Sequence, residues 1–322
     1  MGVHTVVVTG SSGMIGTALC ERLVDSGYDV VGVDREANRW SRRIDSLTIR
    51  CDLVDRNVLR RLPPSPDVVV HLAANARVYE SVEDVSLAEE NISTTAGILE
   101  YVRRNDARLL LASSREVYGN GSARPQPESK LAIDGCESPY AASKIAGEAL
   151  VQAHVNSLGL RAAVLRFSNV YGRYDDTDRV IPTFIARALD NLELTIYGPD
   201  KLLDFTYLDD CIDGIVRTIE RFDAACGRTM NIASGTGHSL QEVATAIVEH
   251  TDSASTVRTA ESRPGEVERF EADIRLARDV LGYQPTYSLQ DGLQRAIDFY
   301  RSHPALLDDL LTEGTMATAP ER

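Results

Sequence analysis

The sequence predicts an α/β fold in which a doubly wound parallel sheet is followed by a smaller C-terminal α/β domain. Two observations support this prediction. Strand-like apolar runs alternate with segments of helical spacing through the first half of the chain. The first strand, which starts at Thr5, leads into a turn that contains Gly10, Gly13 and Gly16. A strand, a glycine-rich turn and a helix in this order are typical of a Rossmann-type sheet.

Each glycine of this turn has a physical role. Gly10 allows a tight turn off the strand, Gly13 lets the backbone approach a pyrophosphate, and Gly16 lets the next helix pack against the strand. That helix directs its unpaired N–H groups and partial positive charge at the phosphates. A second predicted strand, Asp29–Asp34, ends in a carboxylate about 20 residues downstream, where ribose hydroxyls are expected. The combination favours a dinucleotide site over a glycine-rich turn without a ligand.

The composition excludes several classes of protein. The 322 residues suit two closely joined domains or one large α/β unit, and no apolar run is long enough for a transmembrane helix. The N-terminus opens on a strand without a signal-peptide pattern. The five cysteines fit neither a metal site nor a disulfide framework, so we expect reduced thiols and a cytoplasmic protein. These cysteines are Cys20, Cys51, Cys136, Cys211 and Cys226.

The chain is acidic, with a formal net charge of −14, which argues against nonspecific binding to nucleic acid. Lys130, Lys144 and Lys201 are the only lysines among its 34 basic residues. An acidic surface that uses arginine in place of lysine is compatible with a halophilic source. A GC-rich genome, which favours arginine codons, explains the same composition, and the sequence leaves both explanations open.

Small and acidic residues follow two later strands, where a ligand would lie across the sheet. The predicted strand Leu47–Cys51 precedes Asp52 and Leu53, and an acid there can accept a hydrogen bond from an adenine amino group. The predicted strand Asp67–Leu72 precedes Ala73–Ala74, whose small side chains leave room for a ligand. Within that strand, we interpret His71 as a packed residue rather than a ligand or a base.

A serine, a tyrosine and a lysine form a candidate proton-transfer set. The predicted strand Arg108–Ser114 ends in two serines, and Tyr140 and Lys144 are four residues apart, so they share one helix face. A free tyrosine has a pKa near 10. A nearby lysine ammonium and a cationic nicotinamide would both favour the phenolate, so that Tyr140 could act as a general base near neutral pH. Ser114 would hydrogen-bond the same substrate oxygen, and Lys144 would also hold the nicotinamide ribose.

The pattern of predicted strands and helices changes near residue 177. We expect a nucleotide-binding Rossmann domain over residues 1–176, with return segments near 203–235, and a mainly substrate-binding domain over residues 177–303. Residues 304–322 are acidic and then small and polar, so we expect a flexible tail.

The chain resembles extended short-chain dehydrogenases/reductases of the NAD-dependent nucleotide-sugar epimerase/dehydratase family, from about residue 4 to about residue 302. The combined motifs are highly specific for the family and much less specific for the member. The matching segments are Thr9–Gly16, Asp34, Asp52–Leu53, His71–Ala74, Asn91, Ser113–Gly119, Tyr140–Lys144, Arg166–Gly172, Arg263–Glu266 and Leu281–Pro285.

The resemblance implies NAD as the cofactor and no metal. Asp34 favours NAD over NADP because a carboxylate repels the 2′-phosphate, although Arg35 could compensate. The residues implied to hold NAD are Gly10, Gly13, Met14, Ile15, Gly16, Asp34, Arg35, Asp52, Leu53, Leu72, Ala73, Ala74, Asn91, Ala112, Tyr140, Lys144 and Phe167. The implied catalytic residues are Ser114, Tyr140, Lys144 and Glu116, and the implied substrate-binding residues are Ser114, Tyr140, Asn169 and Arg263. The last two would face the substrate diphosphate, a role that suits the arginine fork.

Two departures from the family pattern affect the substrate. Family members often carry an arginine where this chain has Leu203, which removes one anion contact that Lys201 could replace. The pattern of the 4,6-dehydratases has Thr-Asp-Glu at the positions where this chain has Ser114, Arg115 and Glu116. Arg115 cannot donate a proton as an aspartic acid does, which argues against dehydration. Glu116 is either a structural acid that pairs with an arginine or a catalytic acid, as in decarboxylases of the family.

The favoured function is a nucleotide-sugar 4-epimerase of the UDP-glucose/UDP-galactose type that acts through a transient 4-keto sugar. The alternative is a UDP-glucuronate-type decarboxylase, and a non-catalytic NAD-binding protein is a third hypothesis. The resemblance also implies a homodimer that pairs through a four-helix bundle, formed by the segments near Leu87–Arg104 and Tyr140–Leu158 of each subunit.

Overall fold

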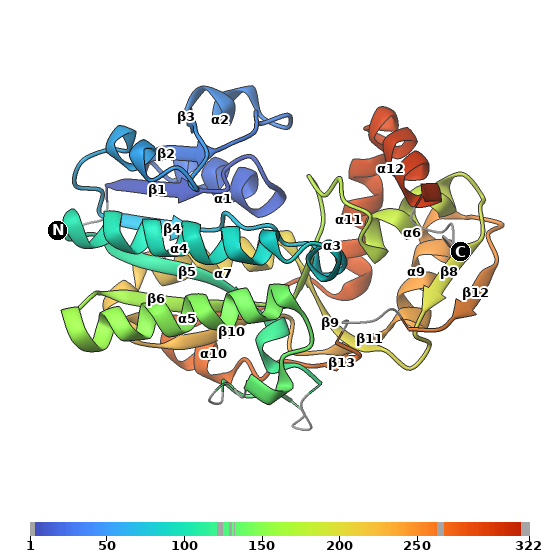
Figure 1. The fold of residues 1–322 in the computed structure, drawn as a ribbon. Coiled ribbons are helices and arrows are strands. Elements are labelled where there is room, and N and C mark those ends of the chain that lie inside the picture. Colours follow the sequence, from blue (N-terminus) through green and yellow to red (C-terminus); the bar gives the residue numbers. More distant parts are fainter. Residues whose placement is uncertain (1–3, 121–124, 129–130, 132, 263–266, 317–322) are drawn as a thin grey trace.

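The computed structural model describes residues 4–120, 125–128, 131, 133–262 and 267–316. Its large sheet has seven parallel strands in the order β10-β6-β5-β4-β1-β2-β3 (Figure 1). The order reverses between β1 and β4, and ligands of open α/β sheets bind at such a switch point, outside the carboxyl ends of the strands. The strands are β1 (Thr5–Thr9), β2 (Asp29–Asp34), β3 (Thr48–Arg50), β4 (Val68–His71), β5 (Arg108–Ser114), β6 (Ala162–Phe167) and β10 (Thr229–Ile232).

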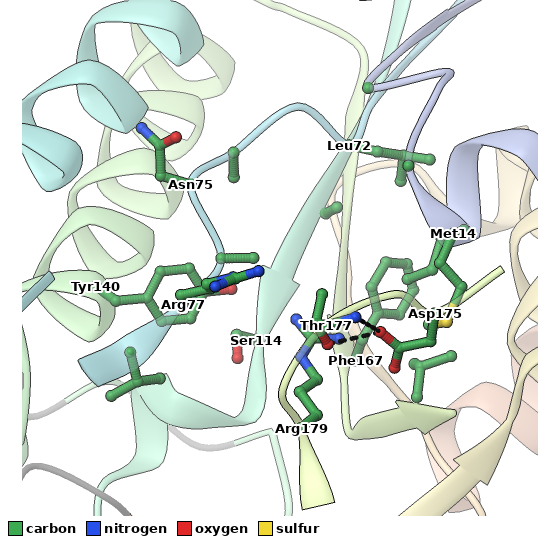
Figure 2. Close-up of a pocket in the computed structure, with 18 of the residues that line it drawn as sticks. Met14, Leu72, Asn75, Arg77, Ser114, Tyr140, Phe167, Asp175, Thr177 and Arg179 are labelled. Atoms are coloured by element: carbon green, nitrogen blue, oxygen red, sulfur yellow. Dashed lines mark hydrogen bonds between the residues drawn. The ribbon is translucent and has the colours of Figure 1, made fainter. Parts of the chain in front are cut away.

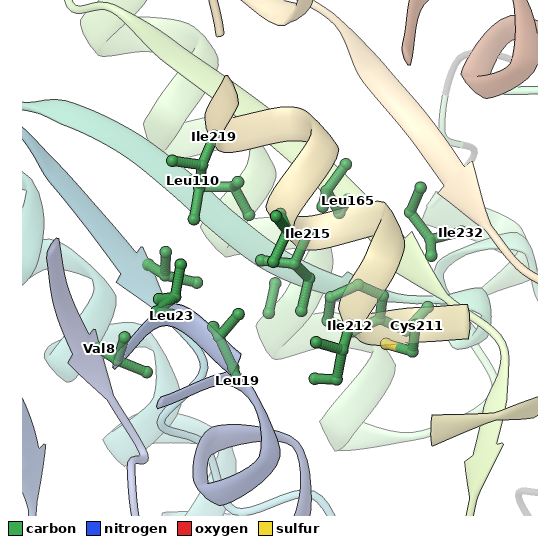
Figure 3. Close-up of a cluster of buried hydrophobic side chains, with 14 of the residues drawn as sticks. Val8, Leu19, Leu23, Leu110, Leu165, Cys211, Ile212, Ile215, Ile219 and Ile232 are labelled. Carbon is green, nitrogen blue, oxygen red and sulfur yellow. The ribbon is translucent and has the colours of Figure 1, made fainter. Parts of the chain in front are cut away.

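Helices cover both faces of this sheet, and Figure 1 shows α4 and α5 side by side over one of them. The strands read as continuous apolar runs because both faces are buried: Val6 and Val8 face one core, and Val7 faces the other. In Figure 3, isoleucines of α7 and leucines of α1 pack against Leu110 and Leu165 of the sheet. The helices of this part are α1 (Met14–Asp25), α2 (Arg42–Ser46), η1 (Arg56–Arg61), α3 (Val78–Glu83), α4 (Ser86–Arg104), η2 (Arg115–Tyr118), η3 (Ile133–Gly135), α5 (Pro139–Leu158), α7 (Leu208–Glu220), α8 (Phe222–Ala225) and α10 (Arg275–Leu281).

The smaller part has its own core around β9, which pairs with β7, β11 and β13, while β8 and β12 form a separate parallel pair. Its strands are β7 (Asn169–Tyr171), β8 (Leu194–Tyr197), β9 (Leu202–Tyr207), β11 (Gly237–Ser239), β12 (Val257–Ala260) and β13 (Arg269–Phe270). Its helices are α6 (Val180–Leu189), α9 (Leu240–Thr251), α11 (Leu289–Arg301) and α12 (Pro304–Met316). In the described part of the chain, no helix combines the length and the apolar character that a membrane span requires.

The chain crosses between the two parts more than once. After β9, the chain returns to the large sheet as α7 and β10, within the segment 203–235. A later return, α10, lies beyond that segment and packs against β10 and α7. The core on this face therefore contains residues from both halves of the sequence, such as Leu19 and Leu281.

The expectation of a flexible tail over residues 304–322 is wrong for residues 304–316. Residues Pro304–Met316 form α12, which packs against α6 and α11, and Leu306 and Leu310 are buried in the core of the smaller part. Leucines at positions 306, 307, 310 and 311 have helical spacing, and this apolar stripe outweighs the acidic residues between them.

His71 is a packed strand residue, as the sequence analysis interpreted it. Its side chain is 3% exposed, with Nδ1 2.7 Å from the Thr9 hydroxyl and Nε2 3.3 Å from the Thr95 hydroxyl. Burial, with a smaller effect of the Lys144 charge, lowers the pKa of His71 from 6.5 to about 3. The folded protein therefore keeps His71 neutral in a pH range where the unfolded chain protonates it.

This difference predicts acid sensitivity. The contribution of His71 to the free energy of unfolding is present above pH 6.5 and falls as the pH drops toward 3, by at most about 1.4 kcal/mol per pH unit. We expect His71→Gln to show a shallower loss between pH 7 and pH 5 than the wild type, measured by urea unfolding. The matched control is His303→Gln, because His303 is exposed. Parallel slopes for His71→Gln and the wild type would refute the assignment.

Candidate active site

A cavity of about 1580 Å³ lies at the carboxyl ends of the large sheet and extends to residues of the smaller part. It brings together the predicted site residues that the structure describes. Those lining it are Gly10, Gly13, Met14, Ile15, Gly16, Asp34, Arg35, Asp52, Leu53, Leu72, Ala73, Ala74, Asn91, Ala112, Ser114, Glu116, Tyr140, Lys144, Phe167 and Asn169. Arg263 lies outside the described residues.

The glycine turn is shaped by close backbone contacts. Gly10 has a φ of 73°, and a Cβ there would lie 2.8 Å from the Ala73 nitrogen. A Cβ on Gly16 would lie 1.9 Å from the Gly10 carbonyl oxygen, so only glycine lets α1 start this close to the turn. A Cβ on Gly13 would meet nothing closer than 3.5 Å, and no side chain caps α1. The uncapped N–H groups at the start of α1 therefore suit a phosphate.

The acid that ends β2, Asp34, is oriented by the backbone. Both Asp34 carboxylate oxygens accept backbone N–H hydrogen bonds at 2.9 Å, one of them from the glycine turn itself. Arg35 points away from this acid: its Nη2 donates to the Asn75 side chain at 3.1 Å, and its Nη1 lies 3.7 Å from a Glu90 oxygen. Arg35 is therefore engaged elsewhere rather than paired with Asp34.

Asn91 supports the wall of the cavity. Its amide accepts a hydrogen bond from Asn75 N at 2.7 Å and donates to Asn75 O at 3.0 Å and to the Ser143 hydroxyl at 3.2 Å. These bonds tie the loop after β4 to α4 and α5. The contacts of Asn91 thus hold the loop that carries Ala73 and Ala74.

The proton-transfer set assembles where β5 ends and α5 begins. The Ser114 hydroxyl lies close enough to Tyr140 to lower the pKa of its phenol, and Figure 2 shows the two side chains facing the same space, with Arg179 near it. Lys144 donates from Nζ to the Ala112 carbonyl at 3.0 Å, and this Nζ lies 5.7 Å from the centre of the Tyr140 ring. The spacing of four residues on one helix face therefore produces the predicted neighbourhood.

The pKa of Tyr140 differs from the sequence-based expectation. Burial raises it above its ordinary value of 10, and this effect exceeds the lowering effects of the nearby Ser114 hydroxyl and of the charges of Arg179 and Arg115. Burial also lowers the pKa of Lys144 to about 8, against the opposing charge of Glu148. The protein alone therefore keeps Tyr140 as a neutral phenol. The expectation treated the lysine as a neighbouring charge and took no account of the burial of both groups.

A buried ion pair that sequence spacing did not reveal fixes α5 on the sheet. Arg166 of β6 donates to both oxygens of Glu148, from Nε at 2.9 Å and from Nη2 at 2.7 Å, and Ser113 donates to the same carboxylate at 2.5 Å. Arg166 is 4% exposed and Glu148 8%. Glu148 lies one turn after Lys144, so this pair holds the helix that carries the candidate catalytic residues.

Removing this pair should be costly. We expect Glu148→Gln to lower the free energy of unfolding by about 3–5 kcal/mol, because it leaves the Arg166 charge buried without a counter-ion. Denaturant unfolding measures the effect. The matched control is Glu100→Gln, which breaks an exposed pair with Arg104 on α4 and should cost less than about 1 kcal/mol. Equal losses in the two variants would contradict a structural role for the buried pair.

The structure gives Glu116 a charged neighbour, which bears on the two roles that the sequence left open for it. Arg115 Nη2 lies 2.9 Å from Glu116 Oε1, and both side chains are about nine-tenths buried or more. Arg115 Nε also donates to the Asn169 side chain at 3.1 Å. Glu116 is therefore an acid paired with an arginine. Close by, Leu203 and Lys201 are buried, and both line the cavity.

The segment 173–179, whose residues 175–179 line the cavity, is a part of the site that the sequence analysis missed. Asp176 pairs with Arg39 at 3.0 Å, and Tyr174 packs against Trp40 of the loop after β2, with ring centres 5.5 Å apart. Trp40 also packs against Phe299 of α11. These contacts join the two parts of the chain over the cavity and place Arg179 near Tyr140.

Comparisons with known proteins agree with this geometry. A model of the NAD dependent epimerase/dehydratase family matches residues 6–233. The chain belongs to this family. NAD is the cofactor of the family, and several similar solved structures contain it.

Similar proteins catalyse more than one reaction. The UDP-glucose 4-epimerase of Mycolicibacterium smegmatis is 30% identical over 311 residues, which cover 92% of this chain and 98% of that protein. The Thermotoga maritima UDP-glucose 4-epimerase structure with UDP-glucose has a TM-score of 0.86 at 27% identity and covers 92% of this chain and 99% of that one. The Bacillus cereus UDP-glucuronic acid 4-epimerase structure has a TM-score of 0.84 at 30% identity, with the same coverage. Other matches are named as UDP-glucuronic acid decarboxylases and a dTDP-glucose 4,6-dehydratase.

Proposed function

We propose that this protein is an NAD-dependent 4-epimerase of nucleotide sugars, with the UDP-linked hexoses glucose and galactose as the first substrates to test. One observation supports the proposal above all: Ser114, Tyr140 and Lys144 meet at a cavity with room for two ligands. Sites for one small molecule usually measure roughly 300–1,000 Å³. This cavity of about 1580 Å³ suits a dinucleotide and a nucleotide sugar together.

We propose that NAD lies along the turn from Gly10 to Gly16 with a ribose on Asp34. The open space at Gly13 and the uncapped start of α1 fit the pyrophosphate, and the oriented Asp34 carboxylate fits ribose hydroxyls but repels a 2′-phosphate. Bound NAD would accept a hydride from carbon 4 of the sugar and return it. Arg35 is engaged with Asn75 and Glu90, which supports the preference for NAD over NADP.

In the proposed reaction, Tyr140 takes the proton of the 4-hydroxyl as the sugar is oxidised and returns a proton when the 4-keto sugar is reduced on its other face. Ser114 donates a hydrogen bond to the same sugar oxygen. Burial favours the neutral phenol in the protein alone, so ionisation of Tyr140 needs the cationic nicotinamide ring beside it. Lys144 would contribute its charge and a hydrogen bond to the nicotinamide ribose.

Epimerisation demands no acid or base beyond Tyr140 and Ser114. Elimination of water needs a further proton donor. In the pattern of the 4,6-dehydratases an aspartic acid occupies the position that Arg115 has in this chain. Glu116 is paired with Arg115 at 2.9 Å. This pairing supports epimerisation over dehydration.

A decarboxylase of the UDP-glucuronate type is the second candidate. The charges of Arg115 and Arg179 both act on Tyr140, so an anionic group next to carbon 4 of the sugar would find cations nearby. Oxidation at carbon 4 of such a sugar gives a β-keto acid, which loses CO₂ from carbon 6. The same oxidation step therefore serves either reaction.

The test uses the purified holoenzyme and UDP-sugars that carry deuterium at carbon 4. We expect UDP-glucose or UDP-glucuronate to give the 4-epimer with the label retained at carbon 4, as followed by NMR. Release of CO₂ and formation of a UDP-pentose would refute the epimerase proposal and support the decarboxylase. Absence of any product from these sugars and from UDP-galactose would refute both.

We also propose that the protein is a cytoplasmic homodimer that pairs through α4 and α5. These helices lie side by side on one face of the sheet, and the exposed positions of α5 include the small residues Ala142, Ala149 and Ala153. The five cysteines are free, as expected in a reducing compartment. Sedimentation analysis should give twice the 35.3 kDa chain mass, and a monomer would exclude this arrangement.

A further inference from the structure

The segment 173–179, which connects β7 to α6, is held against three places at the carboxyl ends of the large sheet. Each of three contacts joins one residue of the segment to a residue that follows β1, β2 or β4. In that order, the contacts are the Tyr174 hydroxyl with a Glu21 oxygen at 3.0 Å, Asp176 with Arg39 Nη1 at 3.0 Å, and Asp178 with Arg77 Nη1 at 3.9 Å. Because β4, β1 and β2 are neighbours in the sheet, the segment runs across the ends of all three strands.

The same three strands lead into the residues proposed to hold NAD. The glycine turn follows β1, Asp34 ends β2, and Ala73–Ala74 follow β4. Residues 175–179 line the same cavity, and Figure 2 shows Asp175 on the same side of it as Met14, at the start of α1. A dinucleotide that extends from Asp34 across the glycine turn would therefore lie between the strand ends and the segment.

The backbone of the segment depends on its surroundings. Tyr174 has a φ of 69°, in the left-handed region that a bulky side chain rarely adopts, and a residue keeps such a conformation only where its contacts fix it. The Tyr174 ring packs against Trp40 and Phe299, with ring centres 5.5 Å and 5.6 Å away. Gly172, with a φ of 146°, precedes the segment and can absorb a backbone rotation. The segment thus has a closed conformation that its contacts maintain, next to a candidate hinge.

We propose that segment 173–179 is a strap that closes over NAD, and that the cofactor enters and leaves only when the strap opens. Each contact joins two groups of the protein itself, so the strap closes without help from the cofactor. In the proposed epimerisation the hydride returns to the sugar and NAD is regenerated in place, so the strap can stay closed between turnovers. The inference rests on the proposed position of NAD and not on which reaction follows.

The pair of Arg39 and Asp176 offers the sharpest test, because it can be broken from either side. Both side chains are partly exposed, and ion pairs of this kind contribute modestly. Arg39→Gln and Asp176→Asn should each destabilise the closed strap and so speed the dissociation of NAD about two- to fivefold. A change in attraction for the anionic pyrophosphate would act differently, because loss of the Asp176 charge would then slow dissociation.

The experiment measures cofactor exchange without a sugar. Purified protein loaded with radiolabelled NAD is mixed with an excess of unlabelled NAD, and the label that remains on the protein is counted after rapid gel filtration at successive times. The double variant Arg39→Gln with Asp176→Asn should be no faster than the faster single variant, because the same contact is already broken. Arg43→Gln is the matched control: it breaks an exposed pair with Asp25, neither residue lines the cavity, and exchange should keep the wild-type rate.

Dissociation that is unchanged or slower in Asp176→Asn overturns the inference, as does an equal acceleration in Arg43→Gln. Single effects that multiply in the double variant also overturn it, because Arg39 and Asp176 would then act separately. Failure of the proposed function is seen independently, as absence of product from UDP-sugars while the strap variants still speed exchange. Wild-type protein that retains no labelled NAD overturns both the strap and the proposed position of the cofactor.

Discussion

Replacing Tyr140 by phenylalanine is expected to lower turnover on the order of 10³-fold, because the phenol is the group proposed to move the proton of the substrate hydroxyl. The ring itself stays in its buried place at the start of α5, so the fold should be kept. NAD should remain bound, since Tyr140 is one of many residues that line the cavity. The rate is measured with a UDP-sugar that the wild type converts.

Retention of the cofactor can be followed by the fluorescence of a tryptophan in the cavity wall. The chain has one tryptophan, Trp40, which lines the cavity, so bound NADH should quench its fluorescence in the wild type and in Tyr140→Phe alike. Tyr28→Phe is the matched control, because Tyr28 packs against the core that contains α1 and does not line the cavity. Comparable rates for Tyr140→Phe and the wild type would exclude Tyr140 as the proton-transfer residue.

A methyl group on Gly16 is expected to lower the free energy of unfolding by about 3 kcal/mol or more. Its Cβ would lie 1.9 Å from the Gly10 carbonyl oxygen and 2.8 Å from the Ser11 Cα, and both contacts are with backbone that cannot rotate away. The start of α1 would have to move off the turn, which would also displace the N–H groups proposed to bind the pyrophosphate. Thermal and denaturant unfolding of Gly16→Ala measure the loss.

Substitutions at two further glycines test the stability of the fold and the binding of the cofactor separately. In Gly13→Ala the new Cβ meets only the Gly10 oxygen at 3.5 Å, so the fold should persist while NADH quenching of Trp40 is lost. In Gly147→Ala the Cβ meets Thr95 at 3.7 Å, an ordinary contact in a helix interior, so stability should be unchanged or rise by about 0.5–1 kcal/mol. If Gly16→Ala were as stable as Gly147→Ala, the close packing of the turn would be refuted.

The parts of the site that could be predicted from the sequence are those in which local spacing determines position. Gly10 to Gly16 lie within one turn, and Asp34 ends the neighbouring strand. Tyr140 and Lys144 share one helix face. The parallel sheet was likewise predictable from alternating apolar segments, because each strand is buried on both faces.

What could not be predicted depends on partners distant in sequence. Glu148 and Arg166 meet only because α5 packs against β5 and β6, and nothing in their spacing indicates that the pair is buried. Arg179 lies near Tyr140 because contacts across the two parts of the chain position segment 173–179. The burial that raises the pKa of Tyr140 in the protein alone could not be predicted either, because burial cannot be measured from a sequence.

The route of the chain has a consequence for any attempt to divide it. The strand β6 is paired on one side by β10, and α7 and α10 cover the same face of the sheet, although all three follow residue 176. A fragment that stops at residue 176 would leave the β6 edge unpaired and the apolar surface around Leu165 open to water. Neither part of the chain can bury its hydrophobic core without residues from the other side of residue 176. We therefore expect the two parts to unfold in a single cooperative transition, and a fragment that ends near residue 176 should not fold.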